Sequence, residues 1–314
     1  MSRKKSNLVL IIIFGVLLLA VAVTYIAKNI KGERSFRDDI IEYGADEISR
    51  IIIQSQPSGT PIELYREDTI WKLQSGEVRY AADQDMANNI TEELALITPD
   101  RLVANKKALW GEYDVTDTSG IKLTLFRTKK SKTGLIIGRF SYNQTTRKPS
   151  TFLRLEGENE VFAVEGYLGM TFNRGIDGLR DKNMLMANKE DISRISFTYP
   201  DSSFTLSKEG TSWLIDGLQA DSAKMAGYVS VLTYLSGLEF RDDFKPEMAT
   251  GAALTVLVEG MGMQPAEIKA YTDPVGHVLV SSRNPETYFS GDQGQIYPRI
   301  FKGRDYFLTP TVKK

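Results

Sequence analysis

The sequence predicts an α+β protein: an N-terminal transmembrane helix followed by two related units of mostly antiparallel sheet, each with one main helix. Three observations support this. Residues 8–27 contain no charged side chain, and the tetrad Ile48-Ser49-Arg50-Ile51 recurs unchanged as Ile192-Ser193-Arg194-Ile195. Short β-branched and alternating segments fill most of the remaining chain. The gaps between them are mostly shorter than the crossovers that parallel strands require, which favours antiparallel pairing.

The N-terminal segment reads as a membrane anchor. Residues 1–7 form a short basic start, and residues 8–27 are long enough to cross a hydrocarbon core of about 30 Å as a helix. Basic residues before a single apolar segment favour a cytoplasmic N-terminus and an extracytoplasmic remainder, although Lys28, Lys31, Arg34 and Arg37 weaken this argument. We therefore expect a single-pass membrane protein, with charged residues 28–45 as a juxtamembrane connector.

A cleaved signal peptide is the alternative reading of the same segment. Ala20-Val21-Ala22 could serve as the small-residue cleavage site. The apolar run continues beyond that site through Val23, Tyr25 and Ile26, so we expect the anchor to be retained.

The repeated tetrad predicts that one structural unit is used twice. Each copy follows two acidic residues, and a tryptophan follows each copy about twenty residues later, Trp71 and Trp213. An Ala-Asp pair then opens a helix-like stretch in each half. We expect α+β unit one to span residues 46–187 and α+β unit two to span residues 188–314.

The predicted elements follow the same order in both units. Each unit begins with three strands and continues with one helix that an aspartate caps, Asp83 in unit one and Asp221 in unit two. Pro99 should close the first helix. Four further strands then complete each unit, and in unit one the second of these, residues 135–137, is expected to end at Gly138. The expected strands are residues 48–54, 62–65, 70–73, 121–126, 135–137, 151–155 and 161–164 in unit one, and 192–198, 204–207, 212–215, 254–258, 268–271, 277–280 and 288–289 in unit two.

Composition excludes several classes of function. Lys plus Arg number 39 and Asp plus Glu 40, which gives a formal net charge of −1 and no electrostatic reason to expect nucleic acid. The chain has no cysteine, so disulfides, thiolate metal sites and cysteine nucleophiles are excluded.

No catalytic, cofactor or metal site is predicted. The single histidine, His277, lies in a predicted strand, whereas a metal site needs several ligands and a catalytic base needs a positioned partner. Residues 114–120 resemble a calcium loop but lack the glutamate that an EF-hand places at its twelfth position, so a polar turn is expected there. Asp83 and Asp85 lie at a helix start, where capping explains them better than acid–base chemistry.

Aromatic residues are the candidates for contact with a ligand or a partner. Trp71 and Trp213 occupy matched positions beside strands, so we expect both to fill equivalent cores. Trp110 has no counterpart in unit two. We take Trp110, Tyr167 and Tyr288 as candidate contact residues.

Several of these features together resemble a known family. They are the N-terminal anchor, the Ile-x-x-Ile strand, the Trp-x-Leu strand before an Ala-Asp helix, the Leu135-Ile136-Ile137-Gly138 strand and the stretch Leu179-Arg180-Asp181-Lys182 before the second tetrad. The series resembles the bacterial family of domain of unknown function 4340 over most of residues 46–314. One departure is Trp110-Gly111-Glu112-Tyr113-Asp114, where the family resemblance leads us to expect a Tyr-Gly-Leu-like turn. The resemblance implies a membrane-tethered bacterial protein without an assigned activity, and it implies an association with ABC-type transporters. It carries over no catalytic residue.

The leading hypothesis is therefore a non-enzymatic, membrane-anchored, extracytoplasmic scaffold or accessory protein of a cell-envelope assembly, whose protein partners include ABC transporter subunits. The alternative is an extracytoplasmic module that binds an envelope glycan or lipid between the two units through exposed aromatic residues. A third reading is an enzyme whose acidic side chains converge in a cleft.

Overall fold

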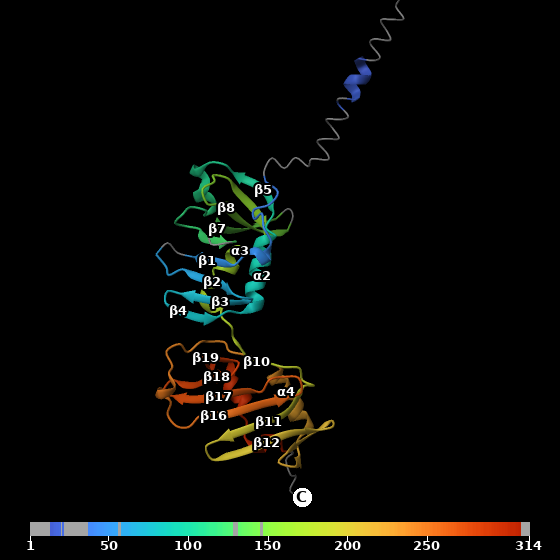
Figure 1. Ribbon diagram of the computed structural model, residues 1–314, viewed down its shortest axis with the longest axis vertical. Helices are drawn as coiled ribbons and strands as arrows, with labels where there is room; N and C mark the ends of the chain where they lie inside the picture. The colour runs from blue at the N-terminus through green and yellow to red at the C-terminus, as the bar shows by residue number, and fades with distance from the viewer. Residues whose placement is uncertain are drawn as a thin grey trace, which may run out of the picture. The chain divides into compact units, whose positions relative to one another are not determined.

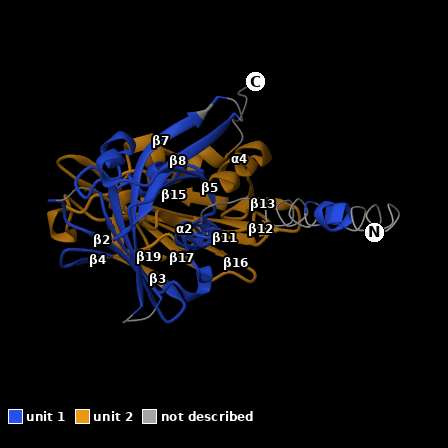
Figure 2. Cartoon of the chain, turned by 90° about the horizontal axis from the view of Figure 1, so that it is seen from above, with its two compact units in different colours: residues 1–70, 74–78, 85–175 blue, residues 71–73, 79–84, 176–314 orange. Residues whose placement is uncertain are grey.

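The computed structural model describes residues 13–19, 21, 37–55, 58–127, 131–144 and 147–308. These residues form mostly antiparallel sheet with few helices, and two large sheets dominate (Figure 1). Two compact units contain them. One comprises Met1–Ile70, Gln74–Val78 and Asp85–Gly175, and the other comprises Trp71–Leu73, Arg79–Gln84 and Ile176–Lys314 (Figure 2).

The first sheet has nine strands in the spatial order β4-β3-β2-β1-β6-β7-β8-β9-β5. From β2 to β5 along this order, each strand pairs with its neighbour in antiparallel fashion. The strands are Arg50–Gln54 (β1), Ile62–Glu67 (β2), Ile70–Ser75 (β3), Val78–Ala81 (β4), Pro99–Ala104 (β5), Ile121–Phe126 (β6), Lys132–Asn143 (β7), Lys148–Leu155 (β8) and Val161–Glu165 (β9).

The second sheet has eight strands in the order β14-β13-β12-β11-β16-β17-β18-β19. A separate two-stranded sheet pairs Asn183–Met186 (β10) with Tyr234–Ser236 (β15). The strands of the second sheet are Ile192–Tyr199 (β11), Ser202–Glu209 (β12), Ser212–Ile215 (β13), Leu218–Gln219 (β14), Leu254–Gly260 (β16), Ala266–Asp273 (β17), Gly276–Ser281 (β18) and Asn284–Ser290 (β19).

Within residues 37–308, the described α-helices are α2 (Gln84–Ala95), α3 (Leu168–Phe172), α4 (Ser222–Thr233) and α5 (Ile296–Ile300). The two twelve-residue helices, α2 and α4, each lie beside a sheet (Figure 1). The aspartate cap predicted for α4 is confirmed, because Oδ1 of Asp221 accepts hydrogen bonds of 3.0 Å from the backbone N–H groups of Ala223 and Lys224. These bonds satisfy two donors that the first turn of a helix leaves without partners.

Alternation along the strands explains which face of each sheet is buried. In β1, Ile51 and Ile53 are buried while their neighbours are partly exposed, as a period of two requires. The repeated tetrad has the same register in both sheets. Ile51 pairs with Leu64 on one side and Leu125 on the other, and Ile195 pairs with Leu206 and Val258. In the second sheet this inner face forms one hydrophobic cluster with the buried face of α4.

Two sequence expectations need correction. The strand expected to end at Gly138 continues to Asn143. A Cβ atom at Gly138 would lie 2.1 Å from the carbonyl oxygen of Tyr113, so glycine is required there for a close backbone approach and does not end the strand. Pro99 does follow the first helix, but it also begins β5, where it pairs with Val164. A proline is acceptable as the first residue of a strand at a sheet edge.

The predicted anchor at residues 8–27 lies largely outside the described residues. Residues 13–19 and 21 are described as helical. Within the part of the chain that the structure describes, no helix is long and apolar enough to cross a membrane.

Candidate functional site

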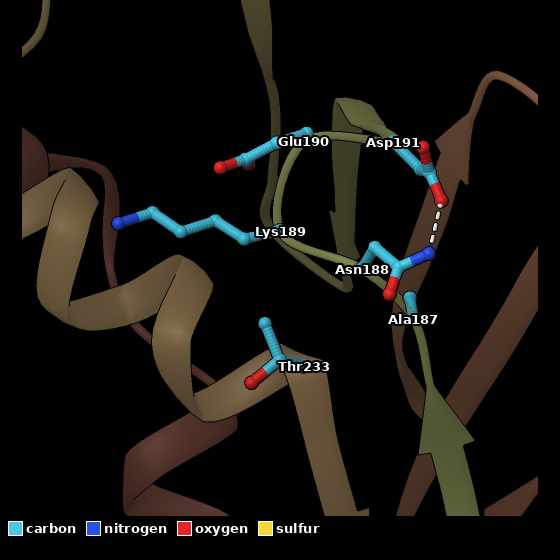
Figure 3. Close-up of a pocket in the computed structure, with 6 residues that line it drawn as sticks. All are labelled: Ala187, Asn188, Lys189, Glu190, Asp191 and Thr233. Atoms are coloured by element: carbon cyan, nitrogen blue, oxygen red, sulfur yellow. Dashed lines mark hydrogen bonds between the residues drawn. The ribbon is translucent and has the colours of Figure 1, made fainter.

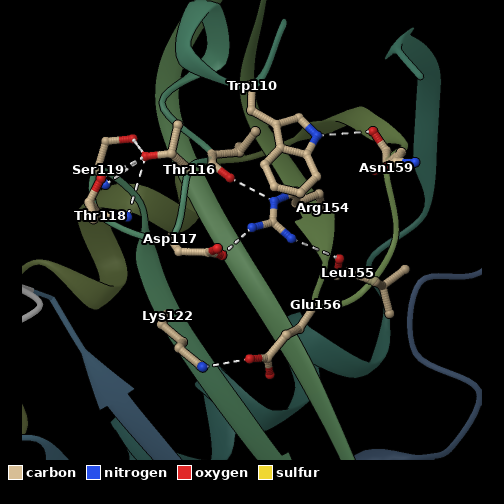
Figure 4. A network of polar contacts seen from close by, with 11 residues as sticks. Trp110, Thr116, Asp117, Thr118, Ser119, Lys122, Arg154, Leu155, Glu156 and Asn159 are labelled. Carbon is tan, nitrogen blue, oxygen red and sulfur yellow. Dashed lines mark hydrogen bonds and ion pairs between the residues drawn. The ribbon is translucent and has the colours of Figure 1, made fainter. Parts of the chain in front are cut away.

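Trp110 covers the outer face of the first sheet, which is the face that points away from α2. Its side chain is 7% exposed and lies over Arg154, with 3.7 Å between the guanidinium carbon and the ring centroid (Figure 4). The indole N–H donates a hydrogen bond of 3.1 Å to the carbonyl oxygen of Asn159. Trp110, which the sequence marked as the first candidate for ligand contact, is therefore a packing residue with its polar atom already bonded.

Arg154 lies beneath Trp110 and forms the polar contacts that join this face to its covering segment. It is only 1% exposed, and its Nε donates to the carbonyl oxygen of Val115 at 2.7 Å. Its Nη1 donates to the carbonyl oxygen of Leu155, and its Nη2 pairs with the Asp117 carboxylate at 2.5 Å (Figure 4). A buried guanidinium is tolerated because its N–H groups have acceptors and its charge has a partner. Trp110 and Val115 pack with apolar residues of the same face, namely Ala104, Ile136, Phe152, Val161 and Ala163.

The equivalent face of the second sheet is only partly covered, and a cavity remains on it. The strand pairings align the two sheets when the two copies of the tetrad are superposed. In that alignment, the cross-strand neighbours Ile136, Arg154 and Val161 of the first sheet correspond to Lys269, Val280 and Tyr288 of the second. Tyr288 thus occupies the position of the buried Val161. It is partly exposed and borders a cavity of about 270 Å³. The cavity is lined by Glu267, Lys269, Tyr271, Val280, Ser281, Ser282, Pro285 and Tyr288.

A loop between β15 and β16 covers the remainder of that face. Its Phe244 is buried and contacts Tyr271 and Tyr288, with ring centroids 5.5 and 5.1 Å apart. Arg241 of the same loop holds it down through a 2.7 Å ion pair with the buried Asp273 at the end of β17. Phe244 and Arg241 therefore fix the positions of both tyrosine rings.

The Arg241 pair perturbs the acidity of Asp273. Burial acts to raise the pKa of Asp273, but the hydrogen bond from Arg241, two backbone N–H donors and the guanidinium charge outweigh it. The pKa of this carboxyl is therefore held below its ordinary value. An ionised, fully hydrogen-bonded carboxylate is suited to fixing a loop and poorly suited to proton transfer near neutral pH.

Tyr167, the third predicted contact residue, is 49% exposed. Its ring stacks on that of Phe140 in β7, with centroids 5.4 Å apart and an interplanar angle of 10°. Tyr142 on the same strand and Met170 on α3 are also exposed. We call these four exposed side chains of the first compact unit the β7–α3 patch.

His277 makes structural contacts with Asp292 and Tyr297. Its Nδ1 lies 2.7 Å from Oδ1 of Asp292, and its ring stacks on Tyr297 at a centroid distance of 3.6 Å. The backbone N–H of His277 also donates to Asp292 at 2.9 Å. Burial acts to raise the pKa of Asp292, but these bonds outweigh it and hold that pKa below its ordinary value. The contacts join β18 to the segment that precedes α5.

A second candidate site surrounds the loop of residues 187–191, between β10 and β11. A cavity of about 590 Å³ lies between this loop and Thr233 at the end of α4 (Figure 3). Another of about 460 Å³ shares Ala187, Asn188 and Asp191 with it. We call these two hollows the 187–191 groove.

Backbone hydrogen bonds hold the loop in place. Ala187 donates to the carbonyl oxygen of Thr233 at 3.1 Å, and Met261 donates to that of Asp191 at 2.9 Å. The Asn188 amide donates to the Asp191 carboxylate at 2.9 Å (Figure 3). Lys189 and Glu190 are both exposed and extend into the groove (Figure 3), so its lining carries charge of both signs.

Large apolar side chains border the 187–191 groove. Met186 and Tyr234 are cross-strand partners in the two-stranded sheet, and each is 61% exposed. Met261 is 81% exposed, and Met263, which is partly exposed, lines the groove, whereas Met184 lies beneath it in the core. Four of the nine methionines of the chain thus lie in two short segments, Met184–Met186 and Met261–Met263. Flexible thioether side chains suit a surface that adapts to an apolar partner.

The two matched tryptophans differ in their surroundings. Trp71 is fully buried, as predicted. Trp213 packs against the core of the second sheet but is partly exposed, and it lines a further cavity of about 210 Å³ together with Met225 of α4 and Lys208. The expected equivalence therefore holds for position along the strands and fails for burial.

Sequence reasoning missed Arg154 and the methionine pairs. Arg154 lies at an outward position of a strand, where alternation predicts a solvated side chain. Only the approach of Trp110, 44 residues earlier in the chain, makes it a core residue. The two Met-x-Met segments were visible in the sequence, but nothing local brings them to one groove. Among the described residues, no group of three or more His, Cys, Asp or Glu side chains could hold a metal ion.

Comparison with known proteins identifies the family. Comparisons with curated proteins and with solved structures gave no match. The model of the family described as "Domain of unknown function (DUF4340)" matches residues 71–251, which is more than half of the chain. The chain belongs to the DUF4340 family.

Proposed function

We propose that this chain is a non-enzymatic, membrane-anchored, extracytoplasmic scaffold or accessory protein of a bacterial cell-envelope assembly, with ABC-type transporter subunits as the first partners to test. The 187–191 groove carries this proposal. Its exposed Met186, Tyr234 and Met261 surround a lining of mixed charge on a backbone held by hydrogen bonds. Contiguous exposed apolar side chains with a polar rim are typical of protein–protein interaction sites. The β7–α3 patch offers a second such surface.

Exposed apolar residues near the N-terminus support the anchor. The large side chains among residues 13–19 and 21, from Ile13 to Val21, are more than half exposed. A helix that is apolar on all sides needs a lipid or protein environment. The basic residues that precede it favour a cytoplasmic N-terminus. The orientation is tested with C-terminal alkaline phosphatase and cytoplasmic reporter fusions. We expect phosphatase activity, and activity of the cytoplasmic reporter alone would reverse the orientation.

We also propose that the two sheets descend from one duplicated unit. Without β5, both follow the same order of strands, and the tetrads have matching partners in both. In each half, the aspartate that precedes the main helix forms a backbone hydrogen bond with a residue much later in the chain. Asp83 donates its backbone N–H to the carbonyl oxygen of Leu179 at 2.9 Å, and Asp221 donates to that of Phe307 at 2.8 Å.

Two hydrogen-bonded carboxylates support structural roles, whereas burial raises the pKa of two others, Glu93 and Asp181. Asp273 and Asp292 both have pKa values held below the ordinary range by hydrogen bonds from Arg241 and His277 respectively. General acids and bases work best with pKa values near the operating pH, so shifts in this direction favour structural roles.

Affinity purification from membranes tests the scaffold proposal. The full chain, with its anchor, is captured alongside a double variant, Met186→Asp with Tyr234→Asp, and a control, Leu218→Asp. Leu218 is also exposed but lies in β14, at the edge of the second sheet. We expect envelope proteins, including transporter subunits, to co-purify with the wild type and the control and to be lost with the double variant. Identical recovery with all three chains would contradict docking at the groove.

The second candidate function is a module that binds an envelope glycan or lipid. The observation that favours it is the open cavity beside Tyr288, which combines two tyrosine rings with charged and hydroxyl groups. Cavities with a few convergent polar groups on an aromatic and apolar lining are typical of small-ligand sites.

A further inference from the structure

We infer that the cavity beside Tyr288 is a saccharide subsite that binds an uncharged pyranose ring. This inference rests on the second candidate function and names its ligand class and its residues. The cavity lies on the outer face of the second sheet, over β17, β18 and β19. Its volume of about 270 Å³ lies just below the ~300–1,000 Å³ of drug-sized sites, which fits a single ring of a longer chain.

The aromatic wall of the cavity is pre-organised. Tyr271 and Tyr288 both pack against the buried Phe244, so neither ring has to be ordered when a ligand binds. A rigid tyrosine offers an apolar ring to the C–H groups of a sugar and a hydroxyl to its oxygens. Burial, with smaller contributions from Tyr271 and Glu247, raises the pKa of Tyr288. Its hydroxyl therefore remains a hydrogen-bond donor at neutral pH.

The polar wall is electrically balanced. Lys269 and Glu267 lie two residues apart on β17 and form an ion pair with 2.6 Å between Nζ and Oε1. Ser282 closes this side, and its Oγ accepts from the backbone N–H of Glu267 at 2.9 Å. A neutralised lysine is a weak site for an anion. An ammonium and a carboxylate side by side can instead donate to and accept from the adjacent hydroxyl groups of a neutral sugar.

The same features disfavour an acyl chain. The aliphatic part of the lining consists of Val280 and Pro285, and charged or hydroxyl groups border them. A hydrocarbon chain would strip water from Lys269 and Glu267 without replacing their hydrogen bonds, which is unfavourable. A sugar satisfies both kinds of surface.

The first sheet contains the closed counterpart of this subsite. Arg154 and Val161 hold the positions of Val280 and Tyr288, and Trp110 covers them. One sugar ring per chain is therefore expected on these two faces, and it should bind at the second sheet.

Titration of the full-length protein in detergent tests the inference. The probes are cellotetraose and tetra-N-acetylchitotetraose, which are uncharged, and tetragalacturonate, which is acidic. Binding is measured by calorimetry and by saturation-transfer NMR. We expect at least one neutral probe to bind at millimolar concentrations or below with little dependence on salt, and Tyr288→Ala to weaken it about tenfold. Tyr288→Phe should retain most of the affinity, and the control Tyr234→Ala should retain all of it.

Lys269→Met provides a variant that leaves the aromatic wall intact. Lys269 is partly exposed, so its replacement should not disturb folding, and we expect neutral-probe affinity to fall severalfold. The inference is overturned if neither neutral probe binds, if only tetragalacturonate binds, or if Tyr288→Ala and Lys269→Met both bind like the wild type. Partner capture through the 187–191 groove is measured on the same variants. Capture without sugar binding would reject this inference alone, and sugar binding without capture would reject the scaffold proposal alone.

Discussion

The two sheets share one strand order, but connecting segments cover their outer faces to different extents. In the first sheet, the segment between β5 and β6 places Trp110 over Arg154 and closes the face. In the second sheet, the segment between β15 and β16 places Phe244 beside Tyr271 and Tyr288, and a cavity remains. The connecting segment, and not the sheet, thus decides whether a face becomes core or surface.

Both faces depend on a buried arginine, but the arginine comes from different elements. Arg154 projects from β8, and the connecting segment supplies its acid, Asp117. Arg241 projects from the connecting segment, and the sheet supplies its acid, Asp273. In the first case the arginine fills the face, whereas in the second it holds the loop at one edge. The second face therefore has no arginine at the position of Arg154, where Val280 is buried instead, and a cavity remains beside Tyr288.

The largest expected effect comes from removing the closure of the first face. Trp110→Ala should lower the free energy of unfolding by about 3–5 kcal/mol, because it removes a large buried ring and exposes Arg154. Tyr288→Ala on the second face should cost about 1 kcal/mol or less, because Tyr288 borders solvent. Urea unfolding of both variants measures the difference. Equal costs would show that the two faces are not finished differently.

Removing the arginine of the first face should have the next largest effect. Arg154→Ala should cost about 3 kcal/mol, because the carbonyl oxygens of Val115 and Leu155 lose their donor while still buried. Val280→Ala, at the matched position of the second sheet, should cost about 1.5 kcal/mol from the lost apolar burial alone. The comparison uses the same unfolding assay. An Arg154→Ala variant as stable as Val280→Ala would contradict the role of Arg154 as a buried anchor.

A double-mutant cycle measures the stacking itself. Trp110→Leu combined with Arg154→Met should give a coupling free energy of about 2 kcal/mol, since the desolvated guanidinium lies against the ring. Lys107 provides the matched control. Its Nζ is 5.2 Å from the same ring centroid, and its side chain is exposed, so Trp110→Leu with Lys107→Met should couple by about 0.5 kcal/mol. Coupling of equal size in both cycles would show that burial does not strengthen the Arg154 stack.

The smallest effect concerns pH and the second face. The folded-state pKa of Asp273 is lowered, so its contribution to stability is fully present above the unfolded pKa of about 3.9. That contribution is lost as pH falls from there through the folded pKa. Asp273→Asn should therefore flatten the acid limb of the stability profile, measured by urea unfolding at a series of pH values. Asp117→Asn, on the first face, serves as the comparison. If Asp273→Asn leaves the acid limb unchanged, the charge of Asp273 does not stabilise the loop through its ion pair with Arg241.

Local patterns were sufficient to predict most strands and both main helices. Ile121–Phe126 alternates and coincides with β6, and Asp221 caps α4 as its position predicts. The sequence analysis missed the strands at residues 78–81, 99–104, 183–186, 218–219 and 234–236. Residues 78–81 and 218–219 have no buried periodicity. Asp216 and Gly217, both with positive φ, form the hairpin turn before β14, and this Asp-Gly pair was the available signal.

The candidate sites could be predicted only in part. Tyr288 was identified from sequence as an aromatic in a late strand, and it borders a cavity. Trp110 was selected because it has no counterpart in unit two. It is buried, because it packs on Arg154, which lies 44 residues later in the chain. The 187–191 groove depends on contacts of Asp191 with Met261 and of Ala187 with Thr233. Such long-range pairings follow from the packing of the whole unit and leave no local sequence signal.

The most direct test of the contrast between the two faces is hydroxyl-radical footprinting of the full-length protein, with and without the neutral tetrasaccharide that binds. We predict that Trp110 reacts slowly in both samples, that Tyr288 reacts readily, and that the sugar protects Tyr288 and leaves Tyr234 unchanged. Rapid oxidation of Trp110, or equal reactivity of Tyr288 in both samples, would contradict the account of a closed first face and a ligand-binding second face.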